Sequence, residues 1–377
     1  MMTASDLNGI TVVTIEQAVA APYASGKLAD AGARVIKIER PEGDFGRGYD
    51  KDAKGSSSYF VWLNRGKESV ALNLKDSDDL ALVKSMIGQA DIFIQNLMPG
   101  AVARLGLDVH DLRAEYPALI TCSISGYGET GPFSQMKAYD LLVQAEVGLA
   151  NLTGSAEAAG RVGVSICDIG AGMTAYQAIL QALIGRATTG KGRHIEVSLF
   201  HALADWMNVP YIQSRHGGRK LTRPGLHHPT IAPYGVYTCG DGGMILFSIQ
   251  NEREWVKFCT DVLGDADMAK EDQFAGNTNR VANRAALDAR IIAVFAKHSR
   301  DDMAHIMTEA DIAFGRLSDM DDLINHPQIR LMTIRTSEGE MEIMTPGALV
   351  DGQIYAATDV PDLGQHTDAI RLEFEQD

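Results

Sequence analysis

The sequence predicts an α/β protein, with a Rossmann-like large domain built on a parallel sheet and a smaller α+β domain. Over the first two hundred residues, β-branched runs alternate with runs of helical length, a pattern typical of a parallel sheet covered by helices on both faces. From about residue 229 the alternation gives way to two strand-like runs joined by a glycine-rich turn. With 377 residues the chain is long enough for two lobes.

The first predicted unit is a strand, a helix and a second strand. β-branched residues predict strands at 9–15 and 33–39. Small residues between them predict a helix at 22–32, with Pro22 at its first helical position and Gly32 at its end.

The turn after the first predicted strand lacks the signature of a dinucleotide site. A Rossmann site has GxGxxG there, and this chain has EQAVAAPYASG instead. The small side chains still allow a ligand to approach the backbone, and a helix N-terminus still favours phosphate. Alternatively, the alanines serve only the close packing of helix on sheet.

The next elements continue the alternation. Residues 76–90 predict an amphipathic helix with acidic residues in its first turn. The runs at 91–97 and 119–128 predict further strands. In the second lobe, 234–250 predicts a hairpin and 251–264 a helix. The expected organisation is a large α/β domain at 1–205, a linker at 206–228, a small α+β domain at 229–330, and a C-terminal segment at 331–377 that returns to the large domain.

Composition excludes several classes of protein. A formal net charge of −15 argues against nucleic-acid binding, which depends on a surplus of Lys and Arg. No apolar run approaches the roughly 20 residues of a membrane helix, and the N-terminus does not resemble a signal peptide, so we expect a cytoplasmic protein without membrane contact. The dispersed cysteines indicate reduced core thiols rather than disulfides or a zinc site; they are Cys122, Cys167, Cys239 and Cys259.

A single acid, Asp168, lies between the apolar run 161–167 and a small-residue segment that opens a helix. Taken alone, this position suits a helix N-cap, because an Asp side chain accepts hydrogen bonds from the first backbone N–H groups. A catalytic carboxylate is the alternative, and the two roles are compatible.

Six short sequence motifs, which follow one another between Asp30 and Phe200, help to interpret Asp168. They are AGARVIKIERPEGD, NRGKESVALNLK, NLMPGAVARLGLD, SGYGETGP, KAYDLLVQAEVGL and TGKGRHIEVSLF. In this order they closely resemble the family III CoA-transferases, which include formyl-CoA transferase, carnitine CoA-transferase and α-methylacyl-CoA racemase. The resemblance implies that each subunit is a ring, that two rings interlock in a homodimer, and that the C-terminal tail returns to the large domain.

The resemblance implies that Asp168 is the catalytic nucleophile. A carboxylate there attacks an acyl-CoA thioester to give a mixed anhydride, and the released thiolate then forms an aspartyl-CoA thioester. Helix N–H groups are expected to keep Asp168 ionised, and the GAGM segment at 170–173 to let substrate approach the backbone. No metal or prosthetic group is expected, because CoA and acyl-CoA are substrates.

The matched motif positions also imply a CoA groove. They are Val19, Ala20, Arg40, Leu72, Lys75, Asn96, Leu97, Arg104 and Lys137. For the basic residues of this set, the alternative is solvated surface charge.

Two features bear on the reaction and the substrate. The racemases carry a His-Asp pair where this chain has Tyr139-Asp140, and tyrosine is a poor base at neutral pH, which favours transfer over racemisation. His227 and His228 replace glycines of the lid in the formate and oxalate enzymes. The strings HPTIAPYG and IQNEREW resemble members that act on C4 and C5 dicarboxylates such as malate, citramalate, itaconate and mesaconate.

A dicarboxylate needs a partner for its second carboxylate. The residues expected to bind the acid are Arg47, Tyr49, Tyr139, His227 and His228, with Arg215 and Arg223 as further cations. Surface or loop packing is the alternative for each. Migration of CoA within one diacid, racemisation on the same scaffold, and CoA binding without turnover also remain open.

Overall fold

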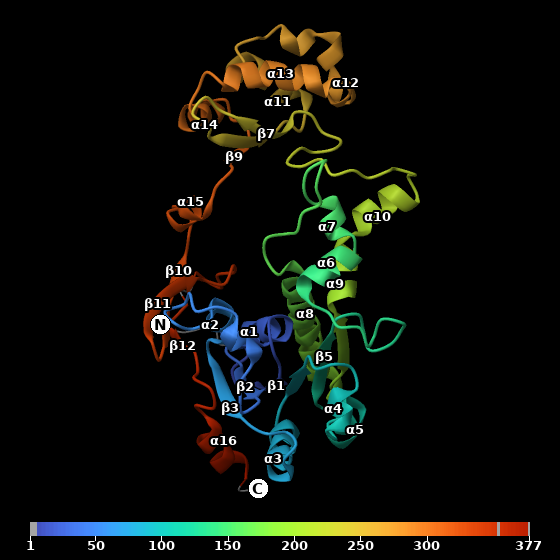
Figure 1. Cartoon of the computed structure of the whole chain (residues 1–377), viewed down its shortest axis with the longest axis vertical. Coiled ribbons are helices and arrows are strands. Elements are labelled where there is room, and N and C mark those ends of the chain that lie inside the picture. The colour runs from blue at the N-terminus through green and yellow to red at the C-terminus, as the bar shows by residue number, and fades with distance from the viewer. Residues whose placement is uncertain (1–5, 353–354, 376–377) are drawn as a thin grey trace. The chain divides into compact units, whose positions relative to one another are not determined.

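The computed structural model describes residues 6–352 and 355–375 (Figure 1). The chain divides into two compact units. The first contains Met1–Asn151, Arg161–Leu221 and Arg330–Asp377, and the second contains Leu152–Gly160 and Thr222–Ile329. Residues 222–228, expected as linker, therefore belong to the second unit, and the tail belongs to the first.

The first unit is built on a six-stranded parallel sheet in the order β3-β2-β1-β4-β5-β6. This is the strand order of a Rossmann-like fold. The strands are β1 (Thr11–Ile15), β2 (Arg34–Glu39), β3 (Lys67–Ala71), β4 (Ile92–Gln95), β5 (Ile120–Ser125) and β6 (His194–Ser198). The prediction of an α/β fold with a parallel sheet is confirmed.

Helices cover both faces of this sheet. The helices of the first unit are α1 (Ala20–Asp30), α2 (Ser58–Asn64), α3 (Ser77–Gly88), α4 (Ala101–Arg104), α5 (Val109–Glu115), α6 (Asp140–Glu146), α7 (Leu149–Leu152), α8 (Ile166–Thr189), α9 (Leu199–Trp206), α10 (Asn208–Arg215) and α16 (Thr367–Phe374), with a 3₁₀ helix η1 at Phe45–Gly48. Successive residues of β1 face opposite layers: Val12 packs in the core that includes α1 and α8, and Val13 in the core that includes α3 and α5.

Helix α1 begins two residues earlier than predicted, at Ala20. Pro22 is therefore its third residue rather than its first. The position still suits proline, because N–H groups in the first turn of a helix have no partner within the helix.

Helices α1 and α8 lie side by side (Figure 1). A Cβ added at Gly172 of α8 would lie 2.6 Å from the carbonyl oxygen of Ala20. A Cβ added at Gly170 would lie 3.1 Å from Leu203. The expectation that these glycines let substrate approach the backbone was wrong, because both positions are occupied by helix packing.

The second unit contains an antiparallel sheet of β7 (Tyr234–Thr238), β8 (Met244–Ser248) and β9 (Phe314–Arg316). Its helices are α11 (Glu252–Lys257), α12 (Gly276–Ala282), α13 (Arg284–Phe295), α14 (Arg300–Glu309) and α15 (Met320–Ile324), with short 3₁₀ turns at Met268–Lys270 and Asp272–Phe274. The helix predicted at 251–264 is two elements, because α11 continues into a π-helical turn at Phe258–Val262. The predicted α+β character of this lobe is confirmed.

The tail forms a second small sheet and a final helix. Strands β10 (Leu331–Thr336) and β11 (Gly339–Met344) are antiparallel, and β12 (Thr358–Asp359) pairs in parallel with β10. Beyond them, His366 and Ser69 of β3 exchange two hydrogen bonds, of 3.0 and 3.1 Å. Helix α16 packs against α3 and β3, so the tail covers the β3 edge of the main sheet.

All four cysteines are buried and free, as predicted for core thiols. Among the helices of the described residues, none is both long enough and apolar enough to cross a membrane.

Candidate active site

A pocket of about 320 Å³ lies in the first unit where the strand order of the main sheet reverses. Its walls include the segments that follow β1, β4 and β5, represented by Gln17, Asn96 and Gly126. Ligands of open α/β sheets bind at this place, outside the carboxyl ends of the strands. The N-terminal part of α8 contributes Asp168 to the same wall.

Asp168 is the third residue of α8, and Ser165 occupies the N-cap position. The residues from 161 to 165 form no strand, and the helix begins at Ile166 within the apolar run. The N-terminus is capped from outside the helix: the Asp140 carboxylate accepts the backbone N–H groups of Cys167, at 2.7 Å, and of Asp168, at 3.3 Å. Asp168 is therefore not the N-cap.

The same arrangement sets the ionisation of Asp168. Burial and, after it, the negative charge of Asp140 raise the pKa of Asp168 to about 7. The expectation that helix N–H groups keep Asp168 fully ionised was wrong, because Asp140 accepts those groups and adds a like charge. Asp168 is instead close to half ionised at neutral pH, in the range of a group that changes protonation during a reaction.

Two side chains hold the loop between β1 and α1, which forms another wall of the pocket. The Asn96 amide accepts the backbone N–H of Gln17 at 3.0 Å and donates to its carbonyl oxygen at 2.8 Å. Asp44 accepts the backbone N–H of Ala18 at 3.1 Å. Ala18 has φ of +63°, a conformation that favours glycine, so these bonds stabilise a strained turn at the point where a dinucleotide site has its glycines.

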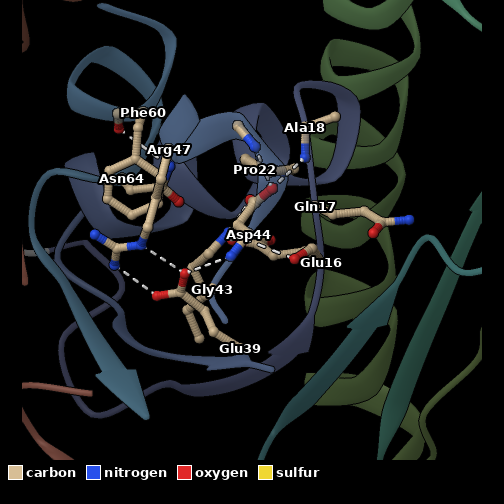
Figure 2. Close-up of polar contacts among 12 residues, drawn as sticks. Glu16, Gln17, Ala18, Pro22, Glu39, Gly43, Asp44, Arg47, Phe60 and Asn64 are labelled. Atoms are coloured by element: carbon tan, nitrogen blue, oxygen red, sulfur yellow. Dashed lines mark hydrogen bonds and ion pairs between the residues drawn. The ribbon is translucent and has the colours of Figure 1, made fainter. Parts of the chain in front are cut away.

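A buried group of charges lies next to this loop (Figure 2). The ammonium of Lys37 contacts Asp44 at 2.8 Å, and Lys67 contacts Glu16 at 2.7 Å; all four side chains are at most 1% exposed. Burial alone would lower the pKa of Lys37 and raise that of Glu16, but the opposite charges prevail and shift both pKa values the other way. For Lys67 burial outweighs the attraction of Glu16 and lowers the pKa to about 8. The charged pair of Lys37 and Asp44 anchors Asp44 beneath Ala18.

Two aromatic side chains, Phe45 and Tyr49, line the pocket that contains Asp168. Their ring centroids are 5.7 Å apart, and Tyr59 packs behind Tyr49 at 5.4 Å. Burial, together with the negative charges of Asp44 and Asp168, raises the pKa of Tyr49 to about 12. Its hydroxyl therefore keeps its proton and is available as a donor at physiological pH.

The structure brings together only part of the predicted residue set. The predicted residues that line the pocket are Ala20, Tyr49, Asn96, Leu97, Lys137, Tyr139 and Asp168. Val19 is the buried N-cap residue of α1, and the side chain of Leu72 lies in the core with α3. The side chains of Arg40, Lys75 and Arg104 are exposed and outside this wall.

Arg47, predicted to bind an acid substrate, is engaged elsewhere. Its guanidinium makes a bidentate pair with Glu39, at 2.7 and 2.8 Å, and stacks 3.7 Å from the centroid of the Phe60 ring (Figure 2). It also donates to the carbonyl oxygen of Pro361 in the tail. These contacts assign Arg47 to the attachment of the tail to the first unit rather than to the pocket wall.

His227 and His228 belong to the packing of the second unit. The ring of His228 stacks on Tyr234 with centroids 5.1 Å apart, and its Nδ1 accepts the backbone N–H of Thr230. His227 packs over Gly235 of β7, where an added Cβ would lie 2.1 Å from its Nδ1. Neither is among the residues that line the pocket around Asp168.

Several lining residues were not predicted: Gln17, Ala18, Phe45, Met98, Pro99, Ser125, Gly126, Ser134, Met136 and Asp140. Six of these ten lie at or just after the carboxyl ends of β1, β4 and β5: Gln17, Ala18, Met98, Pro99, Ser125 and Gly126. The strand-end rule for parallel sheets gives a signal for these positions, whereas nothing in the sequence indicates the capping role of Asp140.

Comparison with known proteins is consistent along the whole chain. A family model described as CoA-transferase family III matches residues 7–367. An acetyl-CoA:oxalate CoA-transferase of Acetobacter aceti is 33% identical over 97% of this chain and 95% of its own length. A succinate–glutarate CoA-transferase of Agrobacterium fabrum is 32% identical over 98% of this chain and 96% of its own length. A crystal structure of a CaiB/BaiF family protein from Brucella suis, 34% identical, aligns with a TM-score of 0.85 over 98% of this chain and 99% of that one.

Proposed function

Because the chain belongs to CoA-transferase family III, as its motifs predicted, we propose that it moves CoA from an acyl-CoA to a free carboxylic acid through covalent intermediates on Asp168. The observation that carries this proposal is the position of Asp168, a half-buried carboxylate in the wall of the pocket at the switch point of the sheet. The ionised form of Asp168 is itself a nucleophile and needs no separate base, and its pKa of about 7 makes that form accessible at neutral pH.

The steps balance without a metal or redox group. The Asp168 carboxylate attacks the thioester carbonyl, the carbon–sulfur bond breaks, and the CoA thiolate leaves with the electron pair. The thiolate then attacks the aspartyl carbonyl of the anhydride and releases the donor acid as a carboxylate. An acceptor carboxylate attacks the resulting aspartyl-CoA thioester, the carbon–sulfur bond breaks, and a second mixed anhydride forms as the CoA thiolate leaves. The thiolate then attacks the acceptor carbonyl of this anhydride, which gives the new acyl-CoA and releases Asp168 as a carboxylate.

The CoA groove implied by the motifs would use two sets of residues, one that lines the pocket and one of exposed basic side chains. Ala20, Asn96, Leu97 and Lys137 line the pocket and are suited to the end of CoA that carries the thiol. Exposed Arg40, Lys75 and Arg104 are suited to the phosphates and adenine, because phosphates favour a solvated cationic surface. Val19 and Leu72 would contribute through backbone, since their side chains are buried.

The proposed acids are dicarboxylates, with C4 and C5 acids such as mesaconate, itaconate, citramalate or malate as the first to test. Both named relatives carry a dicarboxylate in their names, oxalate in one and succinate and glutarate in the other. The two relatives are 33% and 32% identical to this chain, so they favour C2 and longer acids equally. The choice of C4 and C5 acids rests on the motifs of the second unit. Tyr49 and Tyr139, which line the pocket, are proposed as donors to the acid.

Trapping the intermediates tests the nucleophile. The enzyme is incubated with acyl-CoA and a C4 or C5 diacid, quenched with hydroxylamine or borohydride, and the peptide containing Asp168 is analysed by mass spectrometry. A modification that requires acyl-CoA and is lost in Asp168→Asn is expected. An unmodified peptide during turnover would refute covalent catalysis at this residue.

Product analysis separates the alternative reactions. CoA exchange between two different acids indicates transfer, and positional exchange within one labelled diacid indicates intramolecular migration. Deuterium uptake at the α-carbon without CoA exchange indicates racemisation, which the tyrosine at position 139 disfavours.

A further inference from the structure

Three potential metal ligands converge outside the pocket around Asp168. His194 and Glu196 are two residues apart on β6, so their side chains lie on the same face of this strand. Glu129 comes from the segment that follows β5, the strand that pairs with β6. One ligand atom from each side chain lies within 4.8 Å of the other two.

His194 is the buried member of this group, with a side chain only 10% exposed. Its Nδ1 lies 2.9 Å from the hydroxyl oxygen of Thr121, which is opposite it in the β5–β6 register. Its Nε2 is buried and has no hydrogen-bond partner among the described residues. The nearest carboxylate oxygen of Glu196 is 3.8 Å from Nε2, which is too long for a hydrogen bond.

An unsatisfied buried nitrogen is costly and uncommon in folded proteins. The contact with Thr121 suggests a reason: a tautomer with its proton on Nδ1 would donate to Thr121 and leave the lone pair of Nε2 directed away from that bond. The cluster thus places an imidazole nitrogen close to two carboxylates without a hydrogen bond between them. A cation bound between the three groups would satisfy all of them.

We propose that Glu129, His194 and Glu196 bind one first-row divalent metal ion, for which Zn²⁺ is the test ion. One imidazole and two carboxylates supply three protein ligands of the type that Zn²⁺ accepts, and water fills the remaining position. A hydrogen bond from Nδ1–H to the Thr121 hydroxyl would correspond to the outer contact that orients most metal-bound histidines. Ligand separations near 3.3 Å follow from zinc–ligand bonds of about 2.0 Å in tetrahedral geometry, so small side-chain rotations suffice.

The consequence of binding would be mechanical rather than chemical. The ion would join β6 to the segment after β5, whose earlier residue Gly126 lines the pocket. It would therefore hold one wall of the pocket without contacting the reacting atoms. This inference does not depend on the proposed transferase reaction, because binding and stability are measured without substrate.

The test is direct titration of the full-length protein after chelator treatment and desalting. Isothermal titration with Zn²⁺ should show one site per chain with micromolar or tighter affinity. With Co²⁺ as a spectroscopic probe, absorption bands between about 500 and 650 nm should appear and saturate at one equivalent. Zn²⁺ should also raise the melting temperature, because a ligand that binds only the folded state stabilises it.

Variants locate the ion. Glu129→Gln and Glu196→Gln each keep the shape of the side chain and should weaken binding at least tenfold, and the double variant should abolish both the Co²⁺ bands and the Zn²⁺ effect on melting. Glu309→Gln is the matched control, because Glu309 and His305 form an exposed pair at 3.4 Å that no third ligand joins among the residues that the structure describes. That variant should bind like the wild type. Absence of a one-equivalent site, or a site that survives the double variant, would overturn the proposal.

Discussion

At the scale of single residues, the pair Asp140 and Asp168 decides how the pocket ionises. Asp140 caps α8 from the neighbouring helix, so it holds Asp168 in position and at the same time opposes its negative charge. The capping bonds of Asp140 therefore favour the position of Asp168 that catalysis needs, whereas the charge of Asp140 disfavours the ionised form that attacks. This antagonism predicts a measurable dependence on pH.

The rate should rise with pH through about 7, because only ionised Asp168 attacks and its pKa lies near 7. At pH 6 roughly a tenth of such a group is ionised. Asp140→Asn removes the negative charge but keeps an acceptor oxygen for the helix, so the pKa of Asp168 falls and the acidic limb of kcat/KM moves to lower pH. The measurement is kcat/KM from pH 5 to 9 in both proteins.

Asp108→Asn is the matched control for this profile. Asp108 caps α5 in the same way, accepting the backbone N–H groups of His110 and Asp111, and does not line the pocket. In Asp108→Asn the acidic limb of kcat/KM should remain at the pH of the wild-type enzyme. A limb that stays fixed in Asp140→Asn as well would exclude Asp168 as the titrating group.

A second prediction at this scale concerns recognition of the acid. Tyr49 keeps its proton and lines the pocket, whereas Arg47 is paired with Glu39. We expect Tyr49→Phe to raise the KM for a C4 or C5 diacid about tenfold or more, since a hydrogen bond to a charged group contributes roughly 1.5 to 3 kcal/mol. Arg47→Ala should instead lower the melting temperature without discriminating between a diacid and a matched monoacid. Steady-state kinetics with both acids distinguishes the two outcomes.

At the scale of elements, the loop between β1 and α1 depends on charges that lie below it. Asp44 has two separable tasks: its charge balances Lys37, and its oxygen accepts the N–H of Ala18. Substitutions that remove one task or both should therefore have different effects.

Asp44→Asn keeps an acceptor but leaves Lys37 short of negative charge, so the free energy of unfolding should fall by about 3 to 5 kcal/mol with kcat largely kept. Asp44→Ala also releases the strained turn at Ala18, so kcat should fall in addition. Chemical denaturation and kcat below the melting range are the measurements. Equal kcat values in the two variants would show that the bond to Ala18 does not position the pocket.

The contact of α1 with α8 gives another prediction for an element. Gly172→Ala would bring a Cβ to 2.6 Å from the carbonyl oxygen of Ala20, and the strain should cost about 1 to 3 kcal/mol. Gly185→Ala in the same helix has open space around the new Cβ, and it should gain about 0.5 to 1 kcal/mol from helix propensity. Denaturation midpoints compare the two, and a similar effect of both substitutions would contradict this account of the packing.

The elements and the site differ in how far the sequence predicts them. Strands β1, β2, β4 and β5 of the main sheet follow from β-branched runs, whereas β3 and β6 were not predicted as strands. Asp168 is identified through the short motifs that surround it in the sequence. The burial of Lys37 is not predictable in this way, because a lysine within a strand normally indicates a solvent-exposed position. Its partners Glu16 and Asp44 come from other segments, and only the folded chain brings them together. The engagement of Arg47 with Glu39 is hidden for the same reason.

At the scale of the whole molecule, we propose the interlocked homodimer that the family resemblance implies. Large apolar side chains on α9 and α10 of the first unit are 49 to 64% exposed in the single chain: Trp206, Val209, Tyr211 and Ile212. Such a patch is typical of a protein interface. Light scattering should give twice the 40.7 kDa mass of the chain.

Interlocked rings cannot separate while both remain folded. Dilution into the nanomolar range should therefore leave the dimer intact, and subunit exchange between tagged and untagged protein should require denaturant. Rapid exchange under native conditions would rule out interlocking, although an ordinary dimer would remain compatible with the mass.

The return of the tail to β3 has a consequence for synthesis of the chain on the ribosome. Strand β3 ends at Ala71, and His366, which bonds to Ser69 in that strand, is made almost three hundred residues later. At translation rates of 5 to 20 residues per second, the edge of the main sheet waits roughly 15 to 60 s for its cover. The second unit, whose main segment is the continuous run Thr222–Ile329, is complete before that cover emerges. The nascent chain thus carries an open strand edge through most of its elongation, the period in which a chaperone would be of most use to it.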